Sequence, residues 1–203
     1  MMSFVPTSQY LEHIFESEQS FCQLYPLSVQ RLDKLHWSPL TIIYKSVQFL
    51  ANRNNAKILD IGSGTGKFCL AGAYYKPNAA FYGVEQRQYL IGHAESAKEK
   101  LGRLKVQFMH KNFTQLNLKE FNGFYFYNSF FESIPGTEKI DDSIAYSPEL
   151  YHYYSRYLSR ELDEMPTGTR VATYCSWDDE IPPSYRLIET DMDQLLKFWE
   201  KQT

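Results

Sequence analysis

Short apolar runs alternate along this chain with longer stretches in which apolar residues recur every three or four positions. A run of five or six apolar residues is typical of a strand buried on both faces, whereas the longer spacing is typical of an amphipathic helix. The short runs predict five strands, over residues 57–61, 80–85, 105–109, 123–127 and 170–174. Because helices are predicted between them, we expect an α/β fold with a doubly wound, mostly parallel sheet.

The helical stretches are marked by spacing and by their ends. In residues 40–51 the apolar side chains lie four and three positions apart, so one face of the helix is apolar. Ser38 is expected to cap this helix, with Pro39 at its first position. The other helices are predicted over residues 9–16, 27–35, 66–75, 88–101 and 148–164.

The two ends of the chain are less clearly patterned. Residues 184–189 predict a strand, and residues 195–201 fit either a last helix or the second strand of a hairpin. Residues 1–36 contain only short helical pieces. We therefore divide the chain into an N-terminal helical extension, residues 1–36, and a main domain, residues 37–203.

The most specific motif lies directly after the first predicted strand. There Asp60 is followed by Gly62, Gly64 and Gly66, alternating with small residues, and then by a helix. Glycine permits positive φ and lets a ligand approach the backbone closely. The free N–H groups at the start of the helix point at the same place, so the motif predicts a nucleotide-binding turn.

Two common nucleotide motifs do not fit this spacing. A P-loop requires Ser or Thr after its Gly-Lys pair, but Phe68 follows Gly66-Lys67. A dinucleotide fingerprint requires Gly or Ala three positions after its second glycine, and Lys67 and Cys69 occupy the two candidate positions. Both an NTP phosphate cradle and an NAD-dependent oxidoreductase are therefore disfavoured.

The second predicted strand ends in an acid, Glu85, which is well placed to accept hydrogen bonds from both hydroxyls of a ribose. Together, Asp60 to Gly66 and Glu85 resemble motif I and the following acid of the class I S-adenosylmethionine-dependent methyltransferase family. This resemblance implies a Rossmann-like, seven-stranded sheet that closes with an antiparallel hairpin. It also implies that the chain is an enzyme and that S-adenosyl-L-methionine is its cofactor.

The resemblance implies a set of cofactor-binding residues, which are Asp60, Gly62, Ser63, Gly64, Gly66, Glu85, Gln86, Asn112 and Phe113. Where the family often has an acid that binds the adenine amino group, this chain has Asn112, whose amide oxygen can still accept. Phe113 either packs on the adenine or lies in the core. Trp37 is either a lid over the methionine end of the cofactor or part of a helix cap.

Asn128 follows the fourth predicted strand, in the family position that faces the transferred methyl group. The segment Asn128-Ser129-Phe130-Phe131 is similar to the Asn-Pro-Pro-Tyr motif of amino-methylating relatives, but both prolines are absent. Asn128 is therefore the candidate catalytic residue for a nitrogen acceptor. The alternatives are that Asn128 only caps a turn, and that the protein binds the cofactor without catalysis.

Composition adds constraints on partners and location. The formal net charge of −3 gives no electrostatic reason to expect nucleic acid, so we expect the acceptor to be a small molecule or a protein side chain. The three cysteines and five histidines have no metal-site spacing, and no metal is expected. No stretch has the length of a membrane span or the pattern of a secretory signal. We expect a cytoplasmic protein that does not bind membranes, and the oligomeric state is left open.

Overall fold

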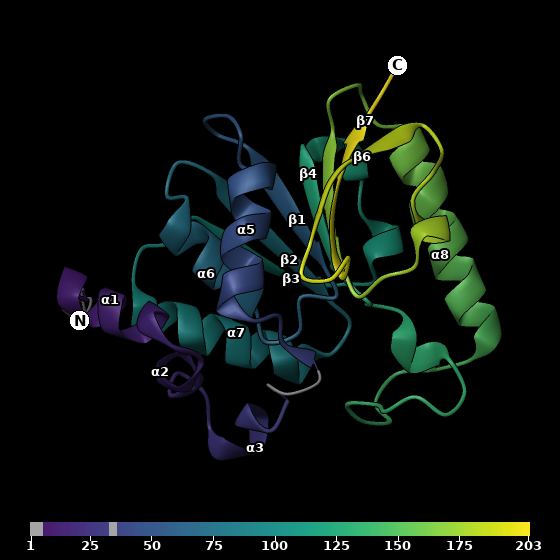
Figure 1. The fold of residues 1–203 in the computed structure, drawn as a ribbon. Coiled ribbons are helices and arrows are strands. Elements are labelled where there is room, and N and C mark those ends of the chain that lie inside the picture. Colours follow the sequence, from purple (N-terminus) through teal and green to yellow (C-terminus); the bar gives the residue numbers. More distant parts are fainter. Residues whose placement is uncertain (1–5, 33–35) are drawn as a thin grey trace.

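The computed structural model describes residues 6–32 and 36–203. Its apolar runs form one seven-stranded sheet with the order β3-β2-β1-β4-β5-β7-β6 (Figure 1). The strands are β1 (Lys57–Ile61), β2 (Ala80–Glu85), β3 (Val106–His110), β4 (Gly123–Tyr127), β5 (Arg170–Tyr174), β6 (Tyr185–Asp191) and β7 (Leu196–Lys201). Strands β1 to β5 are parallel, and β7 is antiparallel to both of its neighbours. The predicted doubly wound sheet with a closing hairpin is confirmed.

The helices are α1 (Ser8–Glu16), α2 (Glu18–Cys22), α3 (Leu27–Gln30), α5 (Leu40–Leu50), α6 (Lys67–Tyr75), α7 (Gln88–Leu101) and α8 (Pro148–Asp163). Those after residue 36 occur where the apolar spacing predicts them, whereas before it α2 was not predicted and the helix expected over 27–35 ends at Gln30, in a turn. Short 3-10 turns are η1 (Phe113–Gln115), η2 (Leu118–Glu120), η3 (Phe131–Ser133) and η4 (Asp178–Glu180). Residues 33–35, at the end of the predicted helix over 27–35, lie outside the described residues. Within the described part of the chain, no helix is long and apolar enough to cross a membrane.

The sheet separates two hydrophobic cores, because successive residues of a strand point to opposite faces. Along β1, Ile58 faces a core that also contains side chains of α1 to α3, α5, α6 and α7. Leu59 and Ile61 face the second core, which contains Leu158 and Leu162 of α8. The helices therefore form a layer on each side of the sheet, as Figure 1 shows. The N-terminal helices share the first core with the main domain.

The start of α5 differs from the prediction. Ser38 does not cap the helix, because its hydroxyl is buried and makes a 2.6 Å hydrogen bond with the hydroxyl of Tyr125. The cap comes instead from α2, where a carboxylate oxygen of Glu18 accepts the backbone N–H of Leu40 at 2.5 Å. A residue distant in sequence thus accepts the free helix N–H that Ser38 was predicted to accept.

Candidate functional site

The glycine turn joins the carboxyl end of β1 to α6. Gly62, Gly64 and Gly66 have φ values of +75°, +52° and +84°, which other residues adopt only with strain. The backbone N–H groups of Gly62 and Ser63 both donate to the carbonyl of Val84 on β2, at 3.0 Å. The turn is therefore fixed to the neighbouring strand and opens toward the carboxyl edge of the sheet, where ligands bind in folds of this class.

Glu85 ends β2 beside this turn and is 5 % exposed. One of its carboxylate oxygens accepts the backbone N–H of Gly64 at 3.2 Å, and the other accepts the backbone N–H of Arg87 at 2.9 Å. These donors hold the carboxylate at the edge of the turn. Each carboxylate oxygen can accept more than one hydrogen bond, so the group retains capacity for a ligand hydroxyl.

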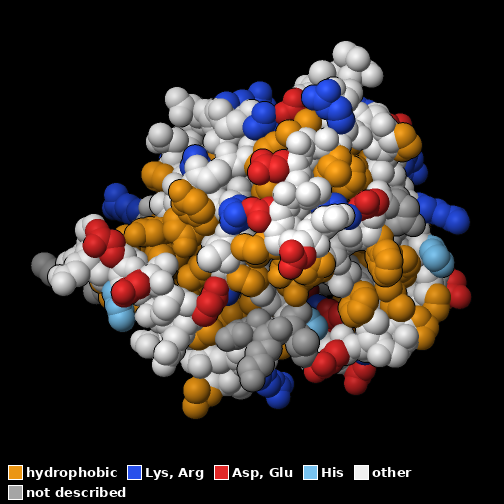
Figure 2. Space-filling view, viewed as in Figure 1, with side chains coloured by type: hydrophobic (Ala, Val, Ile, Leu, Met, Phe, Trp, Pro, Cys, Tyr) orange, Lys and Arg blue, Asp and Glu red, His pale blue; other side chains and the backbone are white. Residues whose placement is uncertain are grey.

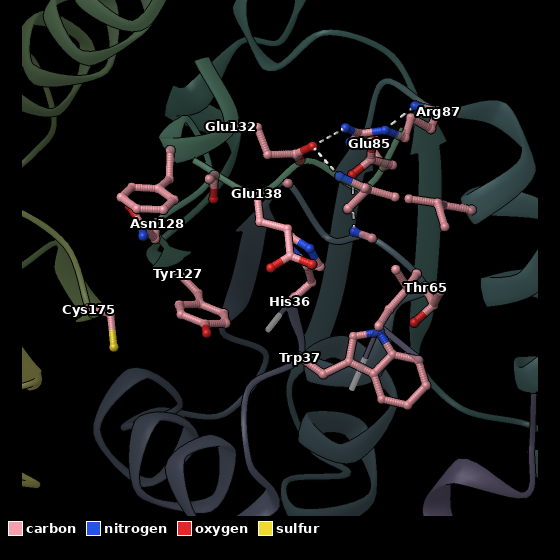
Figure 3. A pocket seen from close by; sticks show the side chains of 17 residues that line it. His36, Trp37, Thr65, Glu85, Arg87, Tyr127, Asn128, Glu132, Glu138 and Cys175 are labelled. Carbon is pink, nitrogen blue, oxygen red and sulfur yellow. Dashed lines mark hydrogen bonds and ion pairs between the residues drawn. The ribbon is translucent and has the colours of Figure 1, made fainter. Parts of the chain in front are cut away.

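A cavity of about 260 Å³ opens at this edge (Figure 3). Four of the predicted site residues line it together: Gly62, Gly64, Glu85 and Asn128. The other lining residues that bear on the chemistry are His36, Trp37, Thr65, Arg87, Tyr127, Phe131, Glu132 and Glu138. Trp37 is in the wall of the cavity and only 6 % exposed, so its ring belongs to the site rather than to a surface cap.

A second, smaller cavity of about 50 Å³ lies beside the first and shares Gly62, Glu85 and Arg87 with it. Gln86 and Phe113 line this second cavity. Phe113 is also part of the core, because it is 4 % exposed and stacks on Phe130 at 5.2 Å between ring centroids. Both of the roles considered for Phe113 are therefore compatible with its position.

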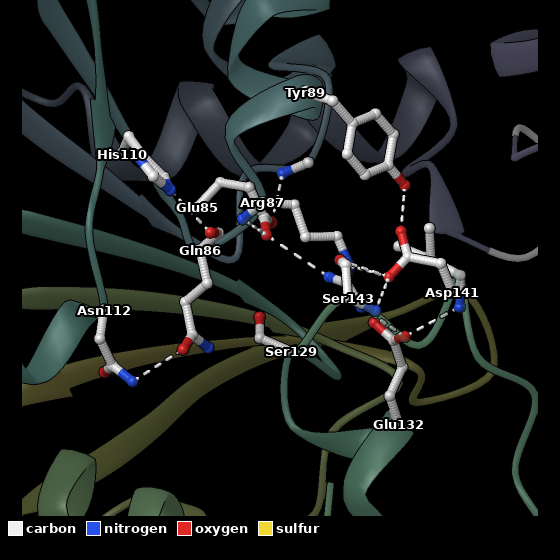
Figure 4. A network of polar contacts seen from close by, with 12 residues as sticks. Glu85, Gln86, Arg87, Tyr89, His110, Asn112, Ser129, Glu132, Asp141 and Ser143 are labelled. Atoms are coloured by element: carbon white, nitrogen blue, oxygen red, sulfur yellow. Dashed lines mark hydrogen bonds and ion pairs between the residues drawn. The ribbon is translucent and has the colours of Figure 1, made fainter. Parts of the chain in front are cut away.

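Asn112 is engaged in local structure. Its amide oxygen accepts the backbone N–H and the hydroxyl of Thr114 at 3.0 and 2.9 Å, and caps η1. Its amide nitrogen donates to Gln86 at 2.9 Å and to the hydroxyl of Tyr154 at 2.8 Å. Asn112 thus fixes the Gln86 side chain in the wall of the smaller cavity (Figure 4). The oxygen of Asn112 already accepts from two donors of Thr114.

The predicted site residues Asp60, Ser63 and Gly66 line neither cavity. Asp60 is 5 % exposed, and burial together with the nearby charge of Glu85 raises the pKa of its carboxyl well above the usual range. Gly66 packs against the ring of Phe108. These residues are therefore part of the packing around the turn and not of the cavity wall.

Asn128 follows β4 with φ of +46°, a conformation that asparagine tolerates better than most residues. Its backbone N–H donates to the hydroxyl of Ser176 at 3.2 Å, which joins the ends of β4 and β5. The residue is partly exposed and lies in the cavity wall next to Tyr127. Its backbone is thus fixed at the carboxyl edge of the sheet, and the residue shares the cavity with Gly62 and Gly64 of the glycine turn.

Two features fit a bound nucleoside cofactor. The hydroxyl of Thr65 is buried and has no hydrogen-bond partner among the described residues, although Thr65 lines the larger cavity. A Cβ added to Gly64 would meet no atom within 4 Å, so open space adjoins the turn at that point. A buried polar atom normally has a partner, and a ligand in this space would supply one.

Sequence reasoning missed the cation of the site, Arg87. Its side chain is 4 % exposed and pairs with Glu85, Glu132 and Asp141. The only signal in the sequence was its place two residues after the predicted ribose acid. Two of its three acidic partners, Glu132 and Asp141, lie 45 and 54 residues downstream of it, beyond the reach of any local pattern.

Comparison with known proteins bears on what this site does. Residues 52–143 match a family model described as a methyltransferase domain. A tRNA (guanine-N(7)-)-methyltransferase of Synechococcus sp. (strain JA-3-3Ab) is 44 % identical over 54 residues, which are 27 % of this chain and 23 % of that protein. The chain therefore aligns with less than a quarter of the length of this curated relative.

Solved structures agree with the fold. TrmN from Thermus thermophilus superposes with a TM-score of 0.59 at 17 % identity, over 85 % of this chain and 52 % of that one. An RNA methyltransferase from Salinibacter ruber, solved in complex with S-adenosyl-L-homocysteine, gives a TM-score of 0.56 at 16 % identity, over 82 % of this chain and 94 % of that one.

These comparisons correct one prediction. The expectation that nucleic acid is not the partner, and that the acceptor is a small molecule or a protein, is wrong, because the relatives with matching sequence are tRNA methyltransferases. The error came from net charge, which describes the average field of the protein and not the chemistry of one cavity. The family model identifies a methyltransferase domain over residues 52–143, and the glycine turn, the acid after β2 and the sheet order agree with the resemblance to class I S-adenosylmethionine-dependent methyltransferases.

Proposed function

We propose that this protein transfers a methyl group from S-adenosylmethionine to a nitrogen atom of an RNA base. The observation that carries the proposal is one continuous cavity that holds both the glycine turn with Glu85 and the polar end of β4 with Asn128. A cofactor and an acceptor bound at these two places would adjoin each other. The names of the relatives in the Synechococcus strains support RNA as the acceptor class.

The cofactor half of the cavity suits an adenosyl group. Glu85 would accept the ribose hydroxyls, and Thr65 has a free hydroxyl for a polar group of the methionine moiety. The smaller cavity, with Gln86 and Phe113, would take the adenine. The bound cofactor supplies a methyl group already activated on a sulfonium, so the protein mainly has to align the acceptor with it.

The acceptor half suits an extruded base. Phe131 lines the cavity and is 36 % exposed, and Trp177 is 61 % exposed two residues beyond Cys175 in the cavity wall. Exposed aromatic rings stack on unpaired bases irrespective of their sequence. The amide of Asn128 would then orient the base by hydrogen bonds to its edge.

The acidic side chains of the cavity favour a nitrogen acceptor. Methylation of an aromatic ring nitrogen such as guanine N7 leaves a positive charge on the ring, and this nitrogen carries no proton that a base must first remove. Glu138 is exposed in the wall of the cavity and is not committed to an ion pair with another described residue. Its carboxylate would stabilise the positive charge that develops during transfer.

The charge on the outer surface does not oppose RNA. On the face seen in Figure 2, lysine and arginine side chains are scattered among acidic ones rather than separated from them. Binding would then rest on stacking and on recognition in the cavity more than on a uniform positive field. We expect a shallow dependence of RNA affinity on salt concentration.

The test is a methyl-transfer assay with S-adenosylmethionine labelled in its methyl group and total RNA as acceptor. RNA is digested to nucleosides afterwards and analysed by mass spectrometry, with 7-methylguanosine as the first expected product. Pretreatment of the substrate with ribonuclease should abolish incorporation, whereas protease treatment should not. Absence of a labelled nucleoside, with S-adenosylhomocysteine still bound, would overturn the RNA assignment and favour binding without catalysis.

Two variants separate the halves of the site. Glu85→Ala should weaken S-adenosylhomocysteine binding in calorimetry and lower transfer with it. Asn128→Ala should leave that binding within about twofold of wild type while transfer falls by about 100-fold, the usual range for a lost orienting group. An Asn128→Ala protein with unchanged transfer would remove this residue from the acceptor site.

A further inference from the structure

Arg87 is the centre of a polar network between the cofactor acid and the segment that follows β4 (Figure 4). One guanidinium nitrogen donates to Glu132 at 2.7 Å and to the hydroxyl of Tyr146 at 2.6 Å. The other two nitrogens contact Asp141 at 3.3 Å and Glu85 at 3.4 Å. A single buried cation therefore faces three carboxylates.

The segment 131–146, which we call the post-β4 segment, depends on this cation. Apart from η3 it contains no helix or strand, so backbone ladders do not hold it in place. Its polar anchors converge on two acids: Glu132 accepts the backbone N–H of Ile140 at 2.8 Å, and Asp141 accepts the hydroxyl of Tyr89 at 2.5 Å. Glu132, Glu138 and Ile140 of this segment also line the larger cavity.

The guanidinium of Arg87 lies closer to its partners in this segment than to Glu85. Its contacts with Glu132 and Tyr146 are shorter than that with Glu85, whose carboxylate also accepts the backbone N–H groups of Gly64 and Arg87. A ribose that donates to Glu85 would draw the carboxylate toward the cavity. Because Arg87 contacts both sides, the position of Glu85 and the order of the post-β4 segment are joined through one side chain.

We propose that Arg87 is a positioning residue that couples cofactor binding at Glu85 to closure of the post-β4 segment over the acceptor part of the cavity. This inference rests on the proposed function, since it takes Glu85 as the ribose ligand. Without the guanidinium, three carboxylates would face one another in a partly buried place, and their mutual repulsion would open the segment. The cofactor would then bind to a site with one wall displaced, and the acceptor pocket would form incompletely.

Calorimetry with S-adenosylhomocysteine tests the coupling through a double-mutant cycle. Arg87→Met should weaken binding by about tenfold, equivalent to about 1.4 kcal/mol. Glu132→Gln should weaken binding by a smaller factor although Glu132 is on the far side of Arg87 from Glu85. In the Arg87→Met background, Glu132→Gln should not weaken binding further and should recover part of it, because it removes one of the three carboxylates that then repel one another. Arg160→Met removes an exposed arginine that pairs with its neighbour Glu161 and lies over the ring of Tyr157, without contact to Arg87 or its three carboxylates among the described residues, and serves as the matched control, with unchanged affinity.

Hydrogen exchange supplies a readout that a merely structural role would not move. In wild type, S-adenosylhomocysteine should increase protection of residues 131–146, and in Arg87→Met it should not, even at saturating ligand. The inference would be overturned if the fold-changes in Kd caused by Arg87→Met and Glu132→Gln multiply in the double variant. It would also be overturned if the ligand still protects residues 131–146 in Arg87→Met. If Arg87→Met does not fold, Tyr146→Phe replaces it in the double-mutant cycle with Glu132→Gln and in the hydrogen-exchange measurement. Failure of wild type to bind the ligand would instead refute the proposed function.

Discussion

Gly66, the last glycine of the turn, offers the sharpest test of how the turn is built. It has φ of +84° and directly precedes α6. A Cβ added there would lie 2.4 Å from a ring carbon of Phe108 and 3.0 Å from the Cβ of Ala94. Gly66→Ala thus combines a left-handed backbone with a steric clash, whereas a Cβ on Gly64 would meet open space.

The two costs can be estimated separately. A left-handed conformation costs a non-glycine residue about 1–2 kcal/mol. Overpacking of a core costs about 1–3 kcal/mol. Gly66→Ala should therefore lower the free energy of unfolding by about 2–5 kcal/mol, and its Tm by roughly 4–20 °C for a chain of this length. Gly64→Ala should lose only the first part, about 1–2 kcal/mol.

Urea unfolding followed by circular dichroism measures both variants, and calorimetry with S-adenosylhomocysteine measures binding. Gly64→Ala should lose more free energy of ligand binding than free energy of unfolding, because its methyl group enters the cavity. Replacing Phe108 by Leu in the Gly66→Ala background should recover part of the stability by relieving the clash. The reasoning is refuted if Gly66→Ala is as stable as Gly64→Ala, or if the Phe108 and Gly66 substitutions are additive.

Two further predictions concern buried charges near the turn. The pKa of Asp60 is raised by burial and by Glu85, so ionisation of this carboxyl destabilises the folded state as pH rises. In urea unfolding, Asp60→Asn should therefore be more stable than wild type at pH 8, and this advantage should shrink toward pH 4. An equal difference in the free energy of unfolding at both pH values would contradict the argument. Lys67 and Glu18 form an ion pair in which the lysine side chain is 5 % and the glutamate 47 % exposed. Glu18→Gln leaves a buried ammonium and should cost about 3 kcal/mol, whereas Lys67→Met leaves a hydrated carboxylate and should cost less; the opposite order of thermal stabilities would refute the argument.

The fold was largely predictable because its signals are local. Strands of a parallel sheet are buried on both faces, so β1, β2 and β4 are mainly apolar runs bounded by turn residues. The predicted bounds of these three strands, 57–61, 80–85 and 123–127, match the structure. The last segment was ambiguous because a short apolar run fits a helix or a strand, and only its pairing with β5 and β6 decides for β7.

The site was predictable only in part, because Arg87 binds acids that are distant in the sequence, and the cap of helix α5 also comes from a distant residue. Glycine at positive φ and an acid at a strand end are readable from Gly62 and Glu85 alone. The pairing of Arg87 with Glu132 is not, since it requires β2 and the segment after β4 to meet at one edge of the sheet. The cap on Leu40 likewise comes from Glu18, twenty-two residues away.

Residues before the first strand illustrate how such distant contacts support the glycine turn. The hydroxyl of Tyr25 donates to the backbone carbonyl of Thr65 at 3.0 Å, inside the glycine turn. The ammonium of Lys67 lies 5.4 Å from the ring of Trp37, which forms part of the cavity wall. A turn that must keep three residues at positive φ gains rigidity from contacts on its outer side, and the sequence supplies them from before the first strand. The division at residue 36 remains a prediction about domains, and the hydrogen bond of Tyr25 to Thr65 joins the segment before it to the glycine turn.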